Sequence, residues 1–211
     1  MIIDFSSSVV HVVDDEAPFR RSLLFLLESS GWQSVGHASA EEFLMAAPSF
    51  PSGGGCIVLD VRMLRISGIE LQRRLKAVHS AYPVIFMTGH GDVDLAVQAM
   101  KDGAIDFLQK PFREQYFLDT VERAVRLSLE RHNAHLRSRE AQQMLDQLSA
   151  REMEVARLLA LGLSNKEVGR QLVISENTVH VHRQHIMEKT GAGGAADFAR
   201  LILRANPGGL D

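Results

Sequence analysis

The sequence predicts an α/β domain with a doubly wound, five-stranded parallel sheet, then a long linker helix, then a small all-α domain of four helices. Three observations lead to this prediction. Short apolar runs alternate with segments of helical spacing up to about residue 125, which is typical of a parallel α/β sheet. The stretch Glu114–Asp146 contains no proline or glycine. From Ser149 onward the segments all have helical spacing.

Five segments in the first part of the chain have the pattern of buried strands. They are Val9–Val13, Ser34–His37, Ile57–Asp60, Val84–Thr88 and Asp106–Leu108. Runs such as Cys56–Leu59 do not alternate polar and apolar residues, because strands of a parallel sheet are buried on both faces. Helical spacing predicts the intervening helices. These are Ala17–Ser30, Ala40–Ala47, Ile69–Val78 and Val93–Lys101.

Length and composition indicate a globular protein of one or two domains. The chain has 211 residues, 45% hydrophobic and 23% charged, with a net charge of −3, so charge alone does not indicate a nucleic-acid partner. The single cysteine, Cys56, lies in an apolar run, which favours a buried thiol. No apolar stretch approaches the ~18 residues of a membrane span, and the first residues lack a signal-peptide pattern. We therefore expect a cytoplasmic protein with no membrane association.

Polar residues suited to phosphate chemistry end or follow four of the predicted strands. They are Asp14, Asp15, Asp60, Thr88 and Lys110. Because the carboxyl ends of parallel strands converge on one crevice, three carboxylates, a hydroxyl and an ammonium group should meet there. An acidic pair alone is usually a solvated turn, and a lone lysine is usually a surface charge. Their occurrence at successive strand ends makes the prediction of a phosphoryl-binding site specific.

The chemistry of this crevice suits transfer of a phosphoryl group to a carboxylate. Mg²⁺ (or Mn²⁺) prefers oxygen ligands and keeps several waters, so two carboxylates and a backbone carbonyl suffice to bind it. Asp60 then has a free oxygen to attack phosphorus, which gives an aspartyl phosphate. Lys110 supplies a positive charge to the phosphoryl oxygens, and Thr88 supplies a hydroxyl hydrogen bond.

Four motifs resemble the receiver domain of bacterial two-component response regulators. They are VVDDE at 12–16, VLDVRM at 58–63, MTGHGD at 87–92 and DFLQKPF at 106–112. The resemblance covers roughly residues 8–125 and implies a flavodoxin-like fold. It implies that Asp60 is the phosphoacceptor and that a sensor histidine kinase is the phosphodonor. It also implies a cis peptide bond before Pro111.

The same resemblance assigns roles to the other residues of the site. Asp15, Asp60 and the backbone carbonyl of Arg62 would bind the metal, with Asp14 acting through a water molecule. Lys110 would contact the phosphoryl group, and two residues would form the switch, Thr88 and Phe107. One position departs from the family, which typically has proline where this chain has Leu64. Proline fixes φ and removes a donor, so we expect a more mobile loop here and an altered rate of phosphorylation or dephosphorylation.

The C-terminal part has four predicted helices, and its sequence from Leu148 to about Leu203 resembles the LuxR/NarL-type DNA-binding domain. The helices are Ala150–Leu161, Asn165–Leu172, Glu176–Lys189 and Ala195–Leu203. A tight turn at Val173–Ser175 joins the second and third, as in a helix-turn-helix unit. In the third helix we expect Val179 and Ile186, and partly His182, to face inward.

The outer face of the third helix then becomes the base-reading surface, with arginine favouring guanine and glutamine favouring adenine. The residues assigned to it are His180, Val181, Arg183 and Gln184. Lys166, Thr178 and Lys189 suit phosphate contacts, which position a protein on DNA without specifying sequence. The partner is therefore expected to be double-stranded promoter DNA, with RNA polymerase as a further partner.

We expect three parts: a receiver at 8–125, a helical linker at 126–147 and a DNA-binding domain at 148–205. A break in the linker near His132–His135 is the alternative to a continuous helix. Phosphorylation is expected to promote a homodimer, which would match a two-fold DNA site. The candidate dimer face comprises Val97, Lys101, Asp106 and Arg123. An ordinary run of surface charges is the alternative for this face.

Two other functions are compatible with parts of the sequence. A phosphatase of the haloacid-dehalogenase type would also form an aspartyl phosphate, but such enzymes place a second aspartate two residues after the nucleophile, where this chain has Arg62. A receiver that no longer switches, with constitutive DNA binding, is the other alternative. The favoured function is a phosphorylation-controlled transcription factor that is no enzyme beyond its own phosphotransfer and dephosphorylation.

Overall fold

The computed structural model describes residues 8–47, 54–77, 82–89 and 93–210. Within these ranges the chain divides into two compact units, the first ending at His132 and the second beginning at Asn133. Each unit has its own buried apolar core.

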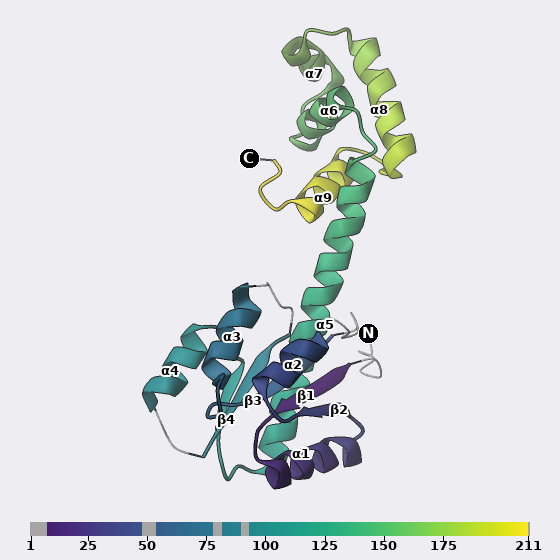
Figure 1. Cartoon of the computed structure of the whole chain (residues 1–211). Helices are drawn as coiled ribbons and strands as arrows, with labels where there is room; N and C mark the ends of the chain where they lie inside the picture. Colours follow the sequence, from purple (N-terminus) through teal and green to yellow (C-terminus); the bar gives the residue numbers. More distant parts are fainter. Residues whose placement is uncertain (1–7, 48–53, 78–81, 90–92, 211) are drawn as a thin grey trace. The chain divides into compact units, whose positions relative to one another are not determined.

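The described part of the first unit contains a sheet of five parallel strands (Figure 1), as predicted. The strands are β1 (Val9–Val13), β2 (Gln33–His37), β3 (Gly55–Asp60), β4 (Val84–Thr88) and β5 (Asp106–Gln109). Their order is β2-β1-β3-β4-β5, with every neighbouring pair parallel. The order reverses between β1 and β3, and the crevice beside such a reversal is where open α/β sheets bind ligands.

Helices cover both faces of this sheet. They are α1 (Ala17–Ser29), α2 (Ala40–Ala46), α3 (Gly68–Ala77), α4 (Val93–Lys101) and α5 (Glu114–Leu145). One core joins apolar residues of α1 and α5 to one face, and the other joins those of α2, α3 and α4 to the opposite face. Side chains alternate along a strand, so β1 sends Val10 and Val12 to the first core and Val13 to the second. The predicted end of the third helix at Val78 lies outside the described residues.

Helix α5 is continuous from Glu114 to Leu145, a length of 32 residues. Its first turns bury Phe117, Val121 and Val125 against the sheet. Beyond this part most of its side chains are exposed until Ala141 and Leu145. The predicted long helix is therefore confirmed, and it is not broken at His132–His135.

The second unit contains the four predicted helices after α5 within the described residues. They are α6 (Ala150–Ala160), α7 (Asn165–Leu172), α8 (Glu176–Thr190) and α9 (Ala195–Ala205). Ser149 and Ser164 cap α6 and α7, each paired with a glutamate three residues later in a capping box. Val179 and Ile186 of α8 are buried and His182 is half-buried, as expected from the helical spacing.

The turn between α7 and α8 is tight. Val173 ends α7 in the left-handed conformation, with φ 56° and ψ 48°. A Cβ atom added at Gly169 would lie 2.8 Å from the carbonyl oxygen of Ile174, so only glycine allows this close approach. The turn therefore holds α8 at a fixed position against α7.

Candidate functional site

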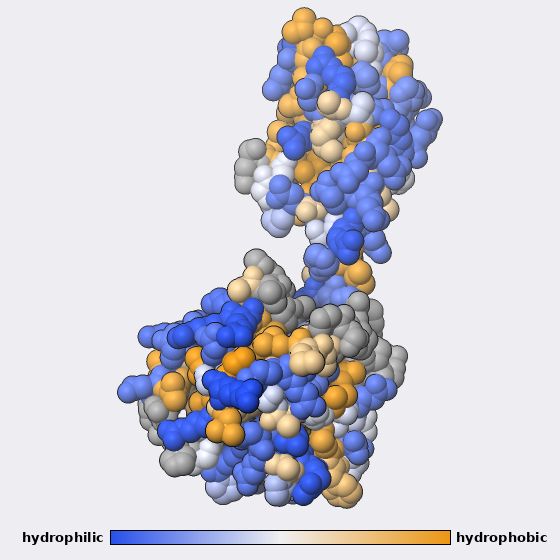
Figure 2. Space-filling view, viewed as in Figure 1, coloured by the Kyte–Doolittle hydropathy of each residue, from blue (hydrophilic) through white to orange (hydrophobic). Residues whose placement is uncertain are grey.

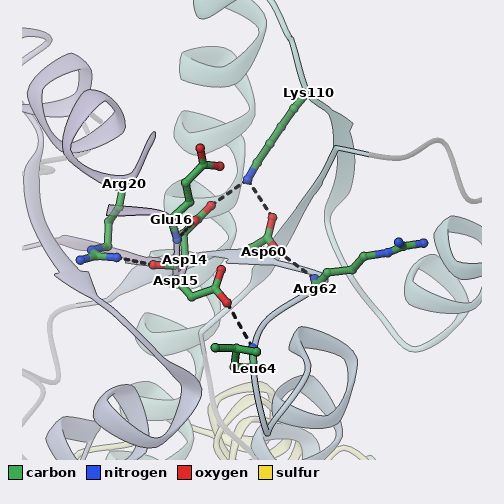
Figure 3. A network of polar contacts seen from close by, with 8 residues as sticks. All are labelled: Asp14, Asp15, Glu16, Arg20, Asp60, Arg62, Leu64 and Lys110. Atoms are coloured by element: carbon green, nitrogen blue, oxygen red, sulfur yellow. Dashed lines mark hydrogen bonds and ion pairs between the residues drawn. The ribbon is translucent and has the colours of Figure 1, made fainter. Parts of the chain in front are cut away.

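The acidic residues that follow β1 and end β3 lie around the ammonium group of Lys110 (Figure 3). Its Nζ donates hydrogen bonds to Oδ2 of Asp14 at 2.7 Å and to Oδ1 of Asp60 at 2.8 Å. Asp14 is 1% exposed and Asp60 is 7% exposed. The residues come from the ends of β1, β3 and β5, so the parallel sheet brings together groups that lie far apart in the sequence.

Backbone groups orient the carboxylates. The amide of Arg62 donates to Oδ2 of Asp60 at 2.8 Å, and the amide of Glu16 donates to Oδ1 of Asp14 at 2.8 Å. The guanidinium group of Arg20 donates to the backbone carbonyl of Asp14 at 2.5 Å. Asp14 and Asp60 thus have one oxygen held by the backbone and the other by Lys110.

The charges in this pocket depend on one another. Burial raises the pKa of the Asp60 carboxyl above its usual value, although the hydrogen bond and charge of Lys110 act in the opposite direction. Burial lowers the pKa of Lys110, but its hydrogen bonds to Asp60 and Asp14 outweigh this effect and raise the pKa overall. Lys110 therefore stays charged and offsets the repulsion between two neighbouring carboxylates.

Asp15, unlike its neighbour Asp14, is exposed. Its Oδ2 accepts a hydrogen bond from the backbone amide of Leu64 at 3.2 Å. In Figure 3 the other carboxylate oxygen of Asp15 points toward the side where Asp60 lies. The amide of Leu64 therefore fixes the direction of the Asp15 carboxylate, a contact that sequence reasoning did not predict.

Thr88 and Phe107 lie on the two neighbouring strands, β4 and β5. Thr88 is buried at the end of β4, and its carbonyl accepts a hydrogen bond from the backbone amide of Lys110 at 2.7 Å. Phe107 is half-buried, and its ring centroid lies 6.3 Å from that of Phe86. The Lys110–Pro111 peptide bond is cis, as expected. Residues 90–92 of the MTGHGD motif lie outside the described residues.

The donor set fits a small, hard cation. In the part of the chain that the structure describes, no three His, Cys, Asp or Glu side chains are grouped closely enough to hold a metal by themselves. Mg²⁺ needs fewer protein ligands, because it keeps several of its waters. Asp14, Asp15 and Asp60 offer carboxylate oxygens, which are the kind of ligand that such a cation prefers. The residues present therefore fit Mg²⁺ or Mn²⁺.

The residues predicted for a dimer face divide into two groups. Asp106 of β5 is paired within the chain, because its Oδ2 accepts hydrogen bonds from the Arg123 guanidinium at 2.6 Å and from the Tyr116 hydroxyl at 2.9 Å. The hydrogen bond to Asp106 raises the pKa of Tyr116. Val97 and Lys101 are exposed on α4. The sequence did not indicate the part that Tyr116 takes in this group.

The predicted DNA-contacting residues lie in α7 and α8. Most are exposed, and Arg183 is half-buried. The exposed residues are Lys166, Thr178, His180, Val181, Gln184 and Lys189. Figure 2 shows a largely hydrophilic surface over α8, whereas separate hydrophobic areas interrupt the surface elsewhere. The face is therefore suited to a polar partner.

Lys189 differs from the other candidates, because its Nζ donates to Oε2 of Glu152 at 2.7 Å. The hydrogen bond from Lys189 and the backbone amide of Ser149 lower the pKa of Glu152 to about 2. Glu152 is the glutamate of the α6 capping box. The S-x-x-E motif indicates the capping role, but it gives no sign of the partner in α8.

The chain thus joins a doubly wound α/β domain with an acidic pocket around a lysine to a helix-turn-helix domain. Residues 10–122 match the family described as the response regulator receiver domain. Residues 146–202 match the family described as bacterial regulatory proteins of the luxR family. The chain belongs to the response regulators that combine these two domains.

Individual relatives agree with this assignment along almost the whole chain. The transcriptional regulatory protein FixJ of Bradyrhizobium diazoefficiens is 41% identical over 93% of this chain and 95% of that protein. The response regulator protein TodT of Pseudomonas putida is 37% identical over 94% of this chain and 86% of that protein. The family is therefore one of transcriptional response regulators.

Solved structures give the same result. The response regulator StyR is 40% identical, with a TM-score of 0.81 over 92% of this chain and 98% of that one. Full-length FixJ from B. japonicum is 40% identical, with a TM-score of 0.59 over 95% of this chain and 98% of that one. A receiver and a LuxR-type domain together imply a kinase phosphodonor and DNA as partners. Among the described residues, no helix is both long and apolar enough to cross a membrane.

Proposed function

We propose that Asp60 accepts a phosphoryl group from a phosphohistidine of a sensor kinase, and that phosphorylation controls transcription. The observation that carries this proposal is the ammonium group of Lys110 between two buried carboxylates, at 2.7 Å and 2.8 Å. Such an arrangement leaves one carboxylate to react and a cation to receive the oxygens of the incoming group. It lies at the crevice where the strand order of the sheet reverses.

The transfer step requires positioning and charge neutralisation more than acid–base chemistry. A carboxylate oxygen of Asp60 forms a bond to phosphorus while the phosphorus–nitrogen bond of the donor histidine breaks. The imidazole nitrogen keeps the electron pair and takes up a proton. Lys110 exchanges a carboxylate oxygen for a phosphoryl oxygen, and the hydroxyl of Thr88 donates a hydrogen bond to another.

Mg²⁺ or Mn²⁺ would be held by Asp15, Asp60 and the backbone carbonyl of Arg62, with Asp14 reached through a water molecule. When bound, the cation neutralises negative charge on the phosphoryl oxygens. The amide of Leu64 keeps Asp15 directed to this position. The chain acts in these steps only on itself, in taking up and losing its phosphoryl group, and it has no other enzymatic activity.

The output of the site is a change of surface. Thr88 moves toward the phosphoryl group and Phe107 turns inward, which alters the face that carries α4 and β5. Phosphorylated chains then pair as a homodimer through a face that comprises Val97, Lys101, Asp106 and Arg123. For Asp106 and Arg123, pairing between chains requires exchange of their present intrachain ion pair.

The C-terminal domain reads promoter DNA. We assign base contacts to the outer face of α8 and phosphate contacts to its ends and to α7, with RNA polymerase as a further partner. Lys189 reaches a phosphate only when it leaves Glu152. The parts we propose are a receiver at 8–125, a linker at 126–147 and a DNA-binding domain at 148–205. We place the protein in the cytoplasm, where it can reach both a kinase and DNA.

A phosphate-uptake assay tests the proposal. Wild-type protein incubated with acetyl phosphate and Mg²⁺ should gain one phosphate, measured by intact-mass spectrometry, and Asp60→Asn should gain none. Asp119→Asn, a substitution of the same chemistry on the exposed side of α5, is the matched control and should behave as wild type. Equal uptake by Asp60→Asn and wild type would show that Asp60 is not the phosphoacceptor.

The coupling to DNA is tested with the same samples. Phosphorylated wild type should sediment as a dimer and should bind selected promoter fragments more tightly than unphosphorylated protein. Equal sedimentation and equal DNA affinity in the two states would exclude control by phosphorylation. That result would favour a receiver that no longer switches.

A further inference from the structure

Lys110 has a third neighbour besides its two carboxylates. Its Nζ lies 4.0 Å from the centroid of the Phe19 ring, on the face of the ring. The hydrogen bonds to Asp14 and Asp60 use two of the three N–H groups of the ammonium. The negative face of an aromatic ring attracts a cation at this distance, so the ring occupies a third side of the ammonium group.

Phe19 is itself held from two directions. The next residue of α1, Arg20, is anchored by its hydrogen bond to the carbonyl of Asp14. The ring of Phe19 meets the ring of Phe112 edge to face, with centroids 6.1 Å apart and an interplanar angle of 79°. Phe112 in turn stacks on Phe117, at 5.4 Å and 20°. We call Phe19, Phe112 and Phe117 the aromatic column.

The aromatic column is anchored in the core of the first unit, because Phe117 of α5 is fully buried there. Phe112 and Phe19 are only partly buried, and they pack against the same core. The column therefore extends from a rigid part of the fold to the reactive pocket. Its outermost ring faces the ammonium group that Asp14 and Asp60 share.

We propose that Phe19 is a positioning residue for phosphoryl transfer, acting through Lys110. A lysine side chain is a flexible stem carrying a point charge, so it needs external contacts to hold one position. During transfer Lys110 must release a carboxylate oxygen and take a phosphoryl oxygen. The ring of Phe19 keeps its contact with the ammonium through this exchange, because it binds a face of the cation that neither oxygen uses. The inference rests on the proposed function of Asp60.

The alternative role for Phe19 is packing alone, since it is a partly buried apolar residue next to the core. Three variants separate the two roles. Phe19→Leu keeps an apolar side chain but removes the aromatic face, and Phe19→Tyr keeps the face. Phe25→Leu is the matched control, since Phe25 lies on the same helix and is 74% exposed.

The first experiment measures phosphate uptake from acetyl phosphate in full-length protein with Mg²⁺. For Phe19→Leu we expect the rate of phosphate uptake at saturating acetyl phosphate to fall about tenfold, because a partly desolvated cation–π contact has an effect of this size. The concentration of acetyl phosphate that gives half the maximal rate should be unchanged. Phe19→Tyr and Phe25→Leu should match wild type. If Phe19→Tyr is as slow as Phe19→Leu, or if Phe19→Leu keeps the wild-type rate, the inference is wrong.

The second experiment asks whether the effect passes through Lys110. In a Lys110→Met background, Phe19→Leu should cause no further loss of rate, because there is no ammonium left to hold. An equal loss in both backgrounds would mean that Phe19 acts by packing. The same variants are titrated with beryllium fluoride, which mimics a carboxylate-bound phosphoryl group, and with Mg²⁺ alone. Phe19→Leu should weaken the binding of beryllium fluoride and leave the binding of Mg²⁺ unchanged. Equal weakening of both would again indicate packing.

Failure of this inference is distinct from failure of the proposed function. If wild type takes up phosphate and Asp60→Asn does not, Asp60 remains the phosphoacceptor. This conclusion does not depend on the uptake rate of Phe19→Leu. If wild type itself takes up none, the proposed function fails and the inference falls with it. Thermal unfolding of each variant, measured alongside, checks that all of them are folded at the assay temperature.

Discussion

The backbone amide of Leu64 donates a hydrogen bond to Oδ2 of Asp15 at 3.2 Å, across 49 positions of the sequence. The side chain of Leu64 is 79% exposed, so this residue acts on the pocket through its amide. A proline at this position has no N–H to donate. The departure from the family pattern, which from the sequence alone predicted a more mobile loop, therefore adds a contact to an acidic residue of the site.

We predict that Leu64→Pro lowers the affinity for Mg²⁺ by about tenfold, because outer hydrogen bonds that orient a metal-binding carboxylate have effects of this size. Leu64→Ala keeps the amide and removes only an exposed side chain, so its affinity should equal that of wild type. Calorimetric titration of full-length protein with Mg²⁺ makes the comparison. Identical affinities for the two variants would show that the amide has no role in orienting Asp15.

The stability of the first unit should depend on a buried histidine pair. Nδ1 of His11 lies 3.1 Å from Nε2 of His37, and both residues are buried among aromatic rings. Burial, assisted by the charge of His37, lowers the pKa of His11 from 6.5 to about 4. The unfolded chain therefore binds a proton at a higher pH than the folded one, and stability is lost as the pH falls from 6.5 toward 4.

We expect the free energy of unfolding of this unit to fall by about 3 kcal/mol between pH 7 and pH 4 through His11 alone. His11→Gln keeps a side chain that forms hydrogen bonds but does not titrate, so much of this pH dependence should disappear. Urea unfolding at a series of pH values measures both proteins. The same slope against pH in wild type and variant would mean that His11 is not the responsible group.

The second unit should lose stability at lower pH, through Glu152. The hydrogen bond from Lys189, with help from the Ser149 amide, lowers the pKa of Glu152 from 4.5 to about 2. Because the folded pKa is depressed, the stabilisation is complete above pH 4.5 and is lost as the pH falls toward 2. We expect Glu152→Gln to lower the free energy of unfolding of this unit at pH 7 by about 2 kcal/mol. This value is smaller than the pKa shift alone would give, because Lys189 is exposed and water screens its interaction with Glu152.

Calorimetric unfolding of full-length protein at pH 7 and pH 3 tests this expectation on the transition of the second unit. The difference in stability between wild type and Glu152→Gln should be smaller at pH 3 than at pH 7. Glu154→Gln, on the same helix but at an exposed carboxylate paired with Arg151, should change little at either pH. A difference between wild type and Glu152→Gln that stays constant with pH would contradict the assignment to the carboxylate charge.

Val173 offers a test of local strain in the helix-turn-helix unit. It adopts φ 56° although it is β-branched, and its side chain is 89% exposed, so no burial offsets the unfavourable backbone conformation. Val173→Gly should stabilise the second unit by about 0.5–1 kcal/mol, after the greater freedom of glycine in the unfolded chain is subtracted. Val173→Ala should give a smaller gain. Chemical denaturation measures the stability of both variants. A glycine variant that is less stable than the alanine variant would contradict this prediction.

Much of the fold could be predicted because its signals are local. The apolar runs, the helical spacing and the turn residues each depend on a few neighbouring residues, and they led to the five strands, the long helix and the four C-terminal helices. The convergence of Asp14, Asp60 and Lys110 was predictable as well, because parallel strands end at the same edge of a sheet.

The contacts that complete the sites could not be predicted in this way. Phe19 meets Lys110, and Leu64 meets Asp15, only after α1 and the loop beyond β3 have packed around the crevice. Nothing in the local sequence of either residue indicates such a partner, because an apolar side chain in a helix or a loop normally serves the core or the surface.

Local patterns along the chain were enough to predict the order of the elements and the kinds of group at the strand ends. The sharing of charges follows only from folding: Asp106 is paired with Arg123, and Lys189 with Glu152. Secondary structure and strand-end chemistry depend on short-range periodicity. Pairing depends instead on which side chains come within about 3 Å of one another once separate elements have packed.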